Sequence, residues 1–185
     1  MLDTLIREGG GGVNTIDLVK EAKNGDKEAL LALIMAQQVE FYKLAFVYMK
    51  NEDDAMDVLQ DMIVILYESI SRLKKDEAFY SWSKTILVNT CKSKLKKNKK
   101  LISIDEIREE SYEDYSENPV DKILLEKYLS TLSIKHQEVI KLRYYLDYDY
   151  DTISKVLKIP LGTVKSRLNA GMNKLKEALG GEYIE

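Results

Sequence analysis

Proline is almost absent from this chain, and its scarcity most constrains what the chain can fold into. Only Pro119 and Pro160 occur in 185 residues, and four of the nine glycines stand together at Gly9–Gly12. Because proline and glycine are the residues that interrupt helices and form tight turns, long stretches of the chain remain free to be helical. The sequence therefore favours an all-α fold over a turn-rich β fold.

Apolar residues recur at three- and four-residue spacing in the first hundred residues, which predicts amphipathic helices. The stripe begins at Ile16, is interrupted by the turn-like Asn24-Gly25-Asp26 and continues through Tyr48. Asn51 is a good N-cap, and the acids after it suit the positive end of a helix dipole. We expect this third helix to bury Ala55, Val58, Leu59, Met62, Ile63, Leu66 and Ile70. A fourth helix should run from about Phe79 to Lys97, with Trp82, Ile86 and Leu87 inward, and complete a compact bundle.

The segment from Asn98 to Asn118 breaks this periodicity. Between residues 105 and 121 there are eight acids and one arginine, a composition typical of a flexible linker. Leu101-Ile102-Ser103-Ile104 is its one short apolar anchor. The expected organisation is two small helical domains joined by a flexible acidic linker: a leader at 1–12, a first domain at 13–97, the linker at 98–119 and a second domain at 120–181.

The second domain also has helical periodicity, beginning with a short helix that carries Ile123, Leu124, Tyr128 and Leu129. Ser133 is expected to cap the next helix. Its last two helices, Tyr150–Leu157 and Pro160 to about Leu179, are joined by Lys158-Ile159-Pro160. Helix, tight turn and helix is the spacing of a helix-turn-helix, whose second helix enters the major groove of DNA.

Polar and apolar residues divide on the last helix. The apolar side holds Val164, Leu168, Gly171 or Met172, Leu175 and Leu179, and the other sides hold Thr163, Lys165, Ser166, Arg167, Asn169 and Lys174. Arginine, asparagine, serine and threonine can pair with base edges, whereas Lys165 and Lys174 suit phosphates. A solvated amphipathic helix has a similar pattern, so this division alone leaves both interpretations open.

Charge is distributed unevenly, although the formal net charge is only −3. Six lysines and no acid lie between Lys92 and Lys100, and six basic residues and no acid lie between Thr152 and Lys176. Because local fields decide what approaches each surface, these two segments are candidates for contact with nucleic acid.

Composition excludes several classes of chemistry and suggests a location. Cys91 is the only cysteine and His136 the only histidine, which is too few for an internal disulfide, a Cys- or His-rich metal site or a histidine-centred triad. We interpret Cys91 as a half-buried thiol in ordinary helix packing. No apolar run approaches the roughly 20 residues needed to cross a bilayer, and the N-terminus lacks a secretory pattern. We therefore expect a cytoplasmic protein without membrane insertion.

The leader has two interpretations. A run of four glycines carries a large entropic cost to order, which indicates a flexible segment. Alternatively, Arg7-Glu8 and the glycines are a purine-rich ribosome-binding sequence read as protein, with Val13 as the true start. The intact mass of the native protein distinguishes the two.

Five segments carry a family resemblance when they are taken in order. They are Gly25–Ala29, Asp54–Asp61, Phe79–Trp82 with Ile86 and Asn89, Leu132–Tyr144, and Gly162–Leu168. They resemble the opening of the first domain, the polymerase-binding helix, the promoter-melting helix, the entry to the second domain and the recognition helix of extracytoplasmic-function (ECF) sigma factors of the sigma-70 family.

The resemblance implies a protein that binds core RNA polymerase and directs promoter-specific initiation, with no catalysis of its own, no cofactor, no metal and no small-molecule substrate. It assigns docking on the beta-prime clamp to Asp54, Asp57, Gln60 and Asp61. It assigns the minus-thirty-five element to Thr163, Lys165, Ser166, Arg167, Asn169 and Lys174, on a domain that also meets the beta flap. The minus-ten element would fall to the loop Leu73–Ala78, which would help to capture a flipped base, and to Ser81, Trp82, Lys84, Asn89, Lys92, Lys96 and Lys97, with Lys94 as a further phosphate contact.

The resemblance also implies a linker that runs through the RNA exit region and a cognate anti-sigma factor. The chain departs from the family pattern at Asn169–Asn173, where further arginines are usual, and after Asn89, where Ser93 and lysines replace an acid and an arginine. Fewer positive charges predict a modest affinity for duplex DNA.

Other interpretations of these residues remain. Asp54, Asp57 and Asp61 could form only a solvated face, Trp82 could be mainly a core residue, and Asn89 a satisfied polar group of its helix. The whole chain could instead be a stand-alone helix-turn-helix regulator, which would need a dimer interface, or a helical adaptor whose second domain has lost DNA binding.

Overall fold

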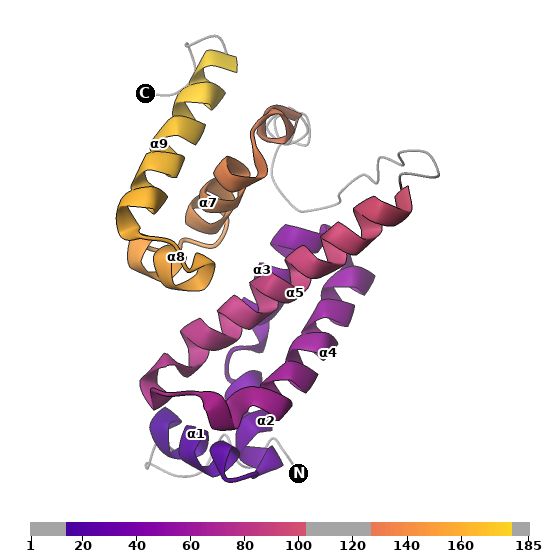
Figure 1. Cartoon of the computed structure of the whole chain (residues 1–185), viewed down its shortest axis with the longest axis vertical. Helices are drawn as coiled ribbons and strands as arrows, with labels where there is room; N and C mark the ends of the chain where they lie inside the picture. The colour runs from indigo at the N-terminus through magenta and orange to yellow at the C-terminus, as the bar shows by residue number, and fades with distance from the viewer. Residues whose placement is uncertain (1–13, 103–126, 179–185) are drawn as a thin grey trace.

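The computed structural model describes residues 14–102 and 127–178, and in these ranges the chain is helical with no strand (Figure 1). The all-α prediction is therefore confirmed. The predicted leader 1–12, the alternative start at Val13, residues 103–119 of the linker, the apolar positions Ile123 and Leu124, and Leu179 lie outside the described residues.

The first body is a bundle of five α-helices and two short 3-10 helices. Its elements are α1 (Thr15–Lys23), α2 (Lys27–Met35), α3 (Gln38–Met49), α4 (Glu52–Ser69), η2 (Ile70–Arg72), η3 (Asp76–Ala78) and α5 (Phe79–Ile102). α3, α4 and α5 pack against one another, and α1 pairs with α2. The core is built on fully buried side chains that include Leu44, Val58, Met62, Phe79 and Leu87.

Within residues 127–178 the second body contains α7 (Ile134–Tyr144), α8 (Tyr150–Leu157) and α9 (Leu161–Ala178), preceded by a short helical segment at residues 127–131. Leu142, Ile153 and Val164, one from each helix, are fully buried and form its centre. α8 also packs on α5, so the two bodies touch (Figure 1).

Local capping explains where several helices begin. The side chain of Asn51 accepts a 2.8 Å bond from the Asp54 amide, which confirms it as the N-cap of α4. Asp26 caps α2 in the same way, by accepting bonds from the Glu28 and Ala29 amides. Ser133 does occupy the N-cap position of α7, but its side chain makes no capping hydrogen bond.

Two expectations about helices were wrong. The predicted second helix is two helices, α2 and α3, which are bent by 67° at their break. This bend allows Leu33 and Ile34 of α2 and Phe41 of α3 all to enter the core. α5 runs to Ile102 rather than ending near Lys97, because no proline or glycine follows to stop it before Pro119.

Ile63 was also misplaced, because it is 40% exposed whereas its neighbour Met62 is fully buried. Successive residues on a helix point about 100° apart, and at this point of α4 the neighbouring helices cover the face that carries Met62 but not the one that carries Ile63. The last helix begins at Leu161, with Pro160 immediately before it. Cys91 is fully buried rather than half-buried, and burial raises the pKa of its thiol to about 12.

No single helix in the described part of the chain is long and apolar enough to span a membrane. The bent pair α2 and α3 meets the length and composition criteria together, yet both helices contribute side chains such as Leu33 and Leu44 to the core.

Candidate nucleic-acid interface

Hydrogen bonds define the turn between α8 and α9. The Asp149 carboxylate caps α8 by accepting a 2.7 Å bond from the Thr152 amide. Lys158 ends α8 in the left-handed region, at φ 53°. The Ser154 hydroxyl then donates to the Ile159 carbonyl at 2.6 Å, and the Pro160 carbonyl accepts from the Thr163 amide at 2.8 Å. These bonds fix the angle at which α9 leaves the turn, as a helix-turn-helix requires.

Gly171 allows α7 and α9 to approach closely. A Cβ atom at this position would lie 2.8 Å from Ile140 Cδ1 and 3.2 Å from the Cβ atom of His136. The glycine therefore has a packing role that explains its presence in the middle of a helix, despite a propensity cost of about 1 kcal/mol.

The polar side of α9 faces away from the body of the domain. Among the predicted contacts, Lys165, Ser166, Asn169 and Lys174 are exposed and Thr163 and Arg167 are half-buried. The predicted apolar side is confirmed at Val164, Leu168, Gly171 and Leu175, which are buried. α9 thus presents a row of potential base and phosphate contacts.

The pKa of His136 in α7 is affected by positive charges on α9. Its pKa is lowered first by burial and then by the positive charges of Lys174 and Arg167. Within the described residues its Nδ1 atom is buried without a hydrogen-bond partner. Two of the predicted DNA contacts, Lys174 and Arg167, therefore both act on His136 of α7.

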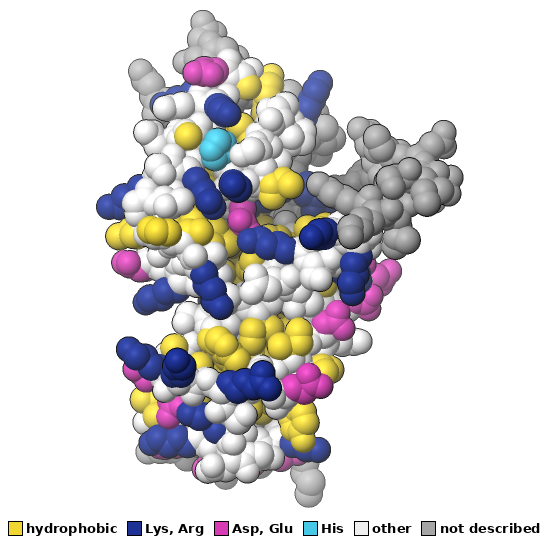
Figure 2. Space-filling view, in the orientation of Figure 1, with side chains coloured by type: hydrophobic (Ala, Val, Ile, Leu, Met, Phe, Trp, Pro, Cys, Tyr) yellow, Lys and Arg dark blue, Asp and Glu magenta, His cyan; other side chains and the backbone are white. Residues whose placement is uncertain are grey.

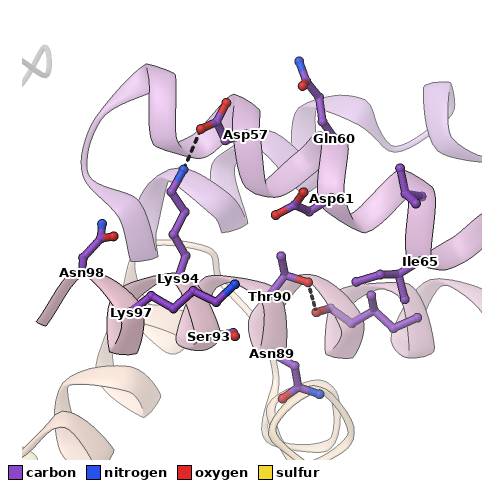
Figure 3. A pocket seen from close by; sticks show the side chains of 12 residues that line it. Asp57, Gln60, Asp61, Ile65, Asn89, Thr90, Ser93, Lys94, Lys97 and Asn98 are labelled. Atoms are coloured by element: carbon purple, nitrogen blue, oxygen red, sulfur yellow. Dashed lines mark hydrogen bonds and ion pairs between the residues drawn. The ribbon is translucent and has the colours of Figure 1, made fainter. Parts of the chain in front are cut away.

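A groove of about 830 Å³ lies between α4 and α5 in the first body (Figure 3). Asp57, Gln60 and Asp61 line it from α4, and Asn89 and Lys97 line it from α5. The structure therefore brings three of the four residues predicted to contact polymerase close to two of those predicted to contact the minus-ten element.

Lys94 joins the two walls of this groove. Its Nζ lies 2.7 Å from Asp54 Oδ1 and 2.7 Å from Asp57 Oδ2, and Figure 3 shows the Asp57 pair spanning the groove. Hydrogen bonds from Lys94 and Asn51 hold the pKa of Asp54 below its usual range. Burial opposes the charge on Lys94, but the two carboxylates outweigh it and raise the pKa of this lysine. Asp54 and Asp57, which were predicted to contact polymerase, therefore form ion pairs with Lys94, which was predicted to contact a phosphate.

The predicted minus-ten residues divide into three groups along α5. Asn89, Lys96 and Lys97 are exposed. Trp82 is half-buried against the core, with its ring centroid 6.4 Å from that of Phe79, and the Ser81 hydroxyl donates to the Ala78 carbonyl at 3.0 Å. Lys84 and Lys92 contact the second domain. Figure 2 shows Lys and Arg side chains over both domains on one face of the molecule.

The loop Leu73–Ala78 is anchored to α1. Lys23 Nζ lies 2.9 Å from Asp76 Oδ1, and both side chains are mostly buried. Leu73 is buried as well. The segment to which the resemblance assigns base capture is thus held in place by a helix about 50 residues away in the sequence, which sequence reasoning did not identify.

Contacts between the two domains were also missed. Tyr48, Glu138 and Tyr148 make them, and none of the three belongs to a set predicted to bind polymerase or DNA. The only sign of these contacts in the sequence was Glu138, the single acid in the otherwise basic and apolar helix α7.

The exposed apolar side chains of α4, among them Val64, Ile65 and Tyr67, were also missed. Periodicity identifies the buried stripe of a helix and not the apolar residues beside it.

An all-helical chain whose second domain carries a helix-turn-helix with a polar second helix is a DNA-binding protein of the helix-turn-helix class. Two family models match it: Sigma-70 region 2 over residues 33–101, and Sigma-70, region 4, over residues 128–177. The chain belongs to the sigma-70 family, in its ECF branch, and directs promoter-specific transcription initiation by RNA polymerase.

Individual relatives agree with this assignment. The chain is 30% identical over 162 residues to RNA polymerase sigma factor SigV of Bacillus subtilis, covering 88% of this chain and 98% of that protein. It is 26% identical over 176 residues to ECF RNA polymerase sigma factor SigW of the same organism, covering 87% and 94%. In fold it is similar to the sigma factor RpoE solved in complex with the anti-sigma factor NepR from Bartonella quintana, with a TM-score of 0.64, 21% identity and coverage of 80% and 95%.

Proposed function

We propose that the groove between α4 and α5 is where this sigma factor joins core polymerase to the minus-ten element, and that α9 reads the minus-thirty-five element. The observation that carries the proposal is the position of Gln60 and Asp61 on one wall of the groove, opposite Asn89 and Lys97 on the other. A polymerase surface bound to α4 would then adjoin DNA bound to α5.

On the polymerase side, the proposal relies on Gln60 and Asp61 more than on Asp54. Gln60 and Asp61 are exposed, whereas Asp54 is half-buried and bonded to Asn51 and Lys94. Exposed Ile63 and Ile65 on the same helix would supply apolar contact area to the beta-prime clamp. Asp57 would contribute its charge while it remains paired with Lys94.

On the DNA side, Asn89, Lys96 and Lys97 are accessible for the minus-ten region, and the lysines suit a single-strand backbone. Trp82 and Ser81 would act near the loop Leu73–Ala78, which is fixed by Lys23. On α9, Arg167 and Asn169 would read base edges, whereas Lys165 and Lys174 would hold phosphates.

The remaining parts of the assignment follow from the family. We propose a first domain that extends from residue 13 to the end of α5 at Ile102, a second domain at 120–181, a linker between them that extends through the RNA exit region, and contact of the second domain with the beta flap. An anti-sigma factor would bind this chain, as one binds the structurally similar RpoE. The protein would act at the nucleoid in the cytoplasm and catalyse no reaction itself.

Co-purification with core polymerase tests the role of the groove. Asp61→Lys reverses an exposed charge on α4 and is expected to reduce the fraction of protein retained on immobilised core polymerase at least tenfold. Glu21→Lys makes the same change at an exposed site on α1 and is the matched control. Equal retention of Asp61→Lys and Glu21→Lys would remove Asp61 from the polymerase surface.

A further inference from the structure

One ion pair connects the first helix of the bundle to the loop Leu73–Ala78. α1 lies against the segment that leads into α5, where it packs on both η2 and η3 (Figure 1). Lys23 is the last residue of α1, and its Nζ lies 2.9 Å from Asp76 Oδ1. The two side chains are only 27% and 20% exposed. Two residues that are 53 positions apart in the sequence are thus joined beside the start of the helix assigned to the minus-ten element.

The backbone around Lys23 is held by the turn that follows it. Gly25 closes this turn with φ 97°, a conformation that favours glycine, and its amide donates to the Ala22 carbonyl at 3.1 Å. Asp26 then caps α2 with its side chain. Because the turn and the cap fix the end of α1, Lys23 reaches Asp76 from a fixed backbone position.

The loop has two attachments, and the residues between them face solvent. Leu73 is buried at one end, and Asp76 is bonded to α1 at the other. Lys74 and Lys75 lie between these points and are exposed. The loop is therefore held with one carboxylate directed to the protein and two ammonium groups available to a ligand.

Lys23 also determines the sign of the charge at this loop. Residues 74–77 contain two lysines and two acids, so the loop alone has no net charge. The ammonium group of Lys23 pairs with the Asp76 carboxylate and leaves one positive charge in excess. A DNA strand approaches a positive loop more readily than one that presents an unpaired carboxylate.

Stability alone is a weak explanation for such a pair. The cost of removing two charges from water offsets much of their attraction, so a largely buried ion pair contributes little relative to apolar residues of the same size. What the pair does provide is a defined direction for the loop, because a charge-assisted hydrogen bond is short and directional.

We propose that Lys23 is a positioning residue for minus-ten recognition. Through Asp76 it would hold the loop in the conformation that selects a base of the minus-ten element, and it would keep the Asp76 carboxylate away from the DNA. Lys23 itself would not touch the DNA in this role. The inference rests on the minus-ten role proposed above for α5 and this loop.

The base preference of the holoenzyme tests this role. Core polymerase loaded with the full chain binds fragments of a promoter induced by overproduction of the protein, with the minus-ten segment randomised, and the bound fragments are sequenced. At the position where the wild type is most selective, we expect Lys23→Met to lower the preference for the best base about fivefold, on the scale of one charge-assisted hydrogen bond. Retention on core polymerase should not change. Lys23→Arg keeps the charge and should keep the preference.

Lys20→Met is the matched control on the same helix. Lys20 pairs with Asp17 at 3.6 Å, and both side chains are exposed, so the substitution should change the preference less than about twofold. Asp76→Asn removes the other partner of Lys23 and should reproduce the loss seen for Lys23→Met. It also provides the test if Lys23→Met does not fold.

Two results would overturn the proposal. One is a wild-type base preference in a folded Lys23→Met or Asp76→Asn holoenzyme. The other is a loss of binding that is equal for all bases, because a role in fold stability alone lowers the amount of bound DNA without changing which base is chosen. If the wild-type holoenzyme itself showed no preference at any minus-ten position, the proposed function would fail instead.

Discussion

Gly171 of α9 lies so close to Ile140 of α7 that a Cβ atom on it would come within 2.8 Å of Ile140 Cδ1. The same atom would lie 3.2 Å from the Cβ of His136, which cannot move without its backbone. The tilt of α9 on α7, and with it the direction of the polar row proposed to contact DNA, depends on this absence of a side chain.

Gly171→Ala is therefore expected to destabilise the second domain. The substitution gains about 1 kcal/mol of helix propensity but loses roughly 1 to 3 kcal/mol to overpacking, so the net loss is up to about 2 kcal/mol, whereas a glycine with open space around it keeps the whole propensity gain. Gly162→Ala is the matched control on the same helix, because no atom lies within 4 Å of its added Cβ. Urea unfolding of both variants measures the difference. If Gly171→Ala proved as stable as Gly162→Ala, the close approach would be wrong.

The Asp54–Lys94 pair predicts a pH dependence of stability. Because the pKa of Asp54 is held below its unfolded value near 3.9, its contribution is complete above that value and is lost as pH falls through the folded pKa. Asp54→Asn should cost roughly 0.5 to 1 kcal/mol of unfolding free energy at pH 7. The difference from the wild type should shrink as pH falls below about 4.

Asp57→Asn is the control for this experiment. Its carboxylate is 64% exposed, against 30% for Asp54, so solvent screens its ion pair with Lys94 more strongly. A loss at pH 7 as large as that of Asp54→Asn would contradict the assignment of Asp54 as the principal partner of Lys94.

Lys158 ends α8 with φ 53°, a conformation that costs a residue with a Cβ atom about 1 to 2 kcal/mol. Lys158→Gly relieves this strain but gives the unfolded chain more freedom, so we expect a net gain of up to about 1 kcal/mol. Thermal unfolding measures it. Lys155→Gly, inside α8, should have the opposite sign, and a lower melting temperature for Lys158→Gly would contradict the role of the left-handed turn.

Arg167→Ala should impair promoter recognition without affecting the attachment to polymerase. Loss of a bidentate contact to a base costs about 1 to 3 kcal/mol, which corresponds to a five- to 150-fold reduction of initiation at the cognate promoter. Lys176→Ala, an exposed basic residue nearer the end of α9, is the control. Should Arg167→Ala instead abolish co-purification with polymerase, the roles assigned to the two domains would be wrong.

The sequence predicted features that depend on the spacing of residues along one helix. It did not predict features that depend on contacts with another helix. The buried stripe of α4, the cap Asn51 and the two helices of the helix-turn-helix follow from spacing and residue type. The break at Ala36-Gln37, the exposure of Ile63 and the bond between Tyr48 and Glu138 depend on where other helices lie. Gly171 is the clearest case, since its propensity cost is visible in the sequence but its partner Ile140 is not.

This chain gives core RNA polymerase its promoter specificity. Run-off transcription with purified core polymerase, on a template that carries a promoter induced by overproduction of the protein, tests it most directly. We predict a discrete transcript with the wild-type protein, none with core polymerase alone, and much less with Arg167→Ala. Binding of the protein to that DNA without any polymerase-dependent transcript would contradict the claim.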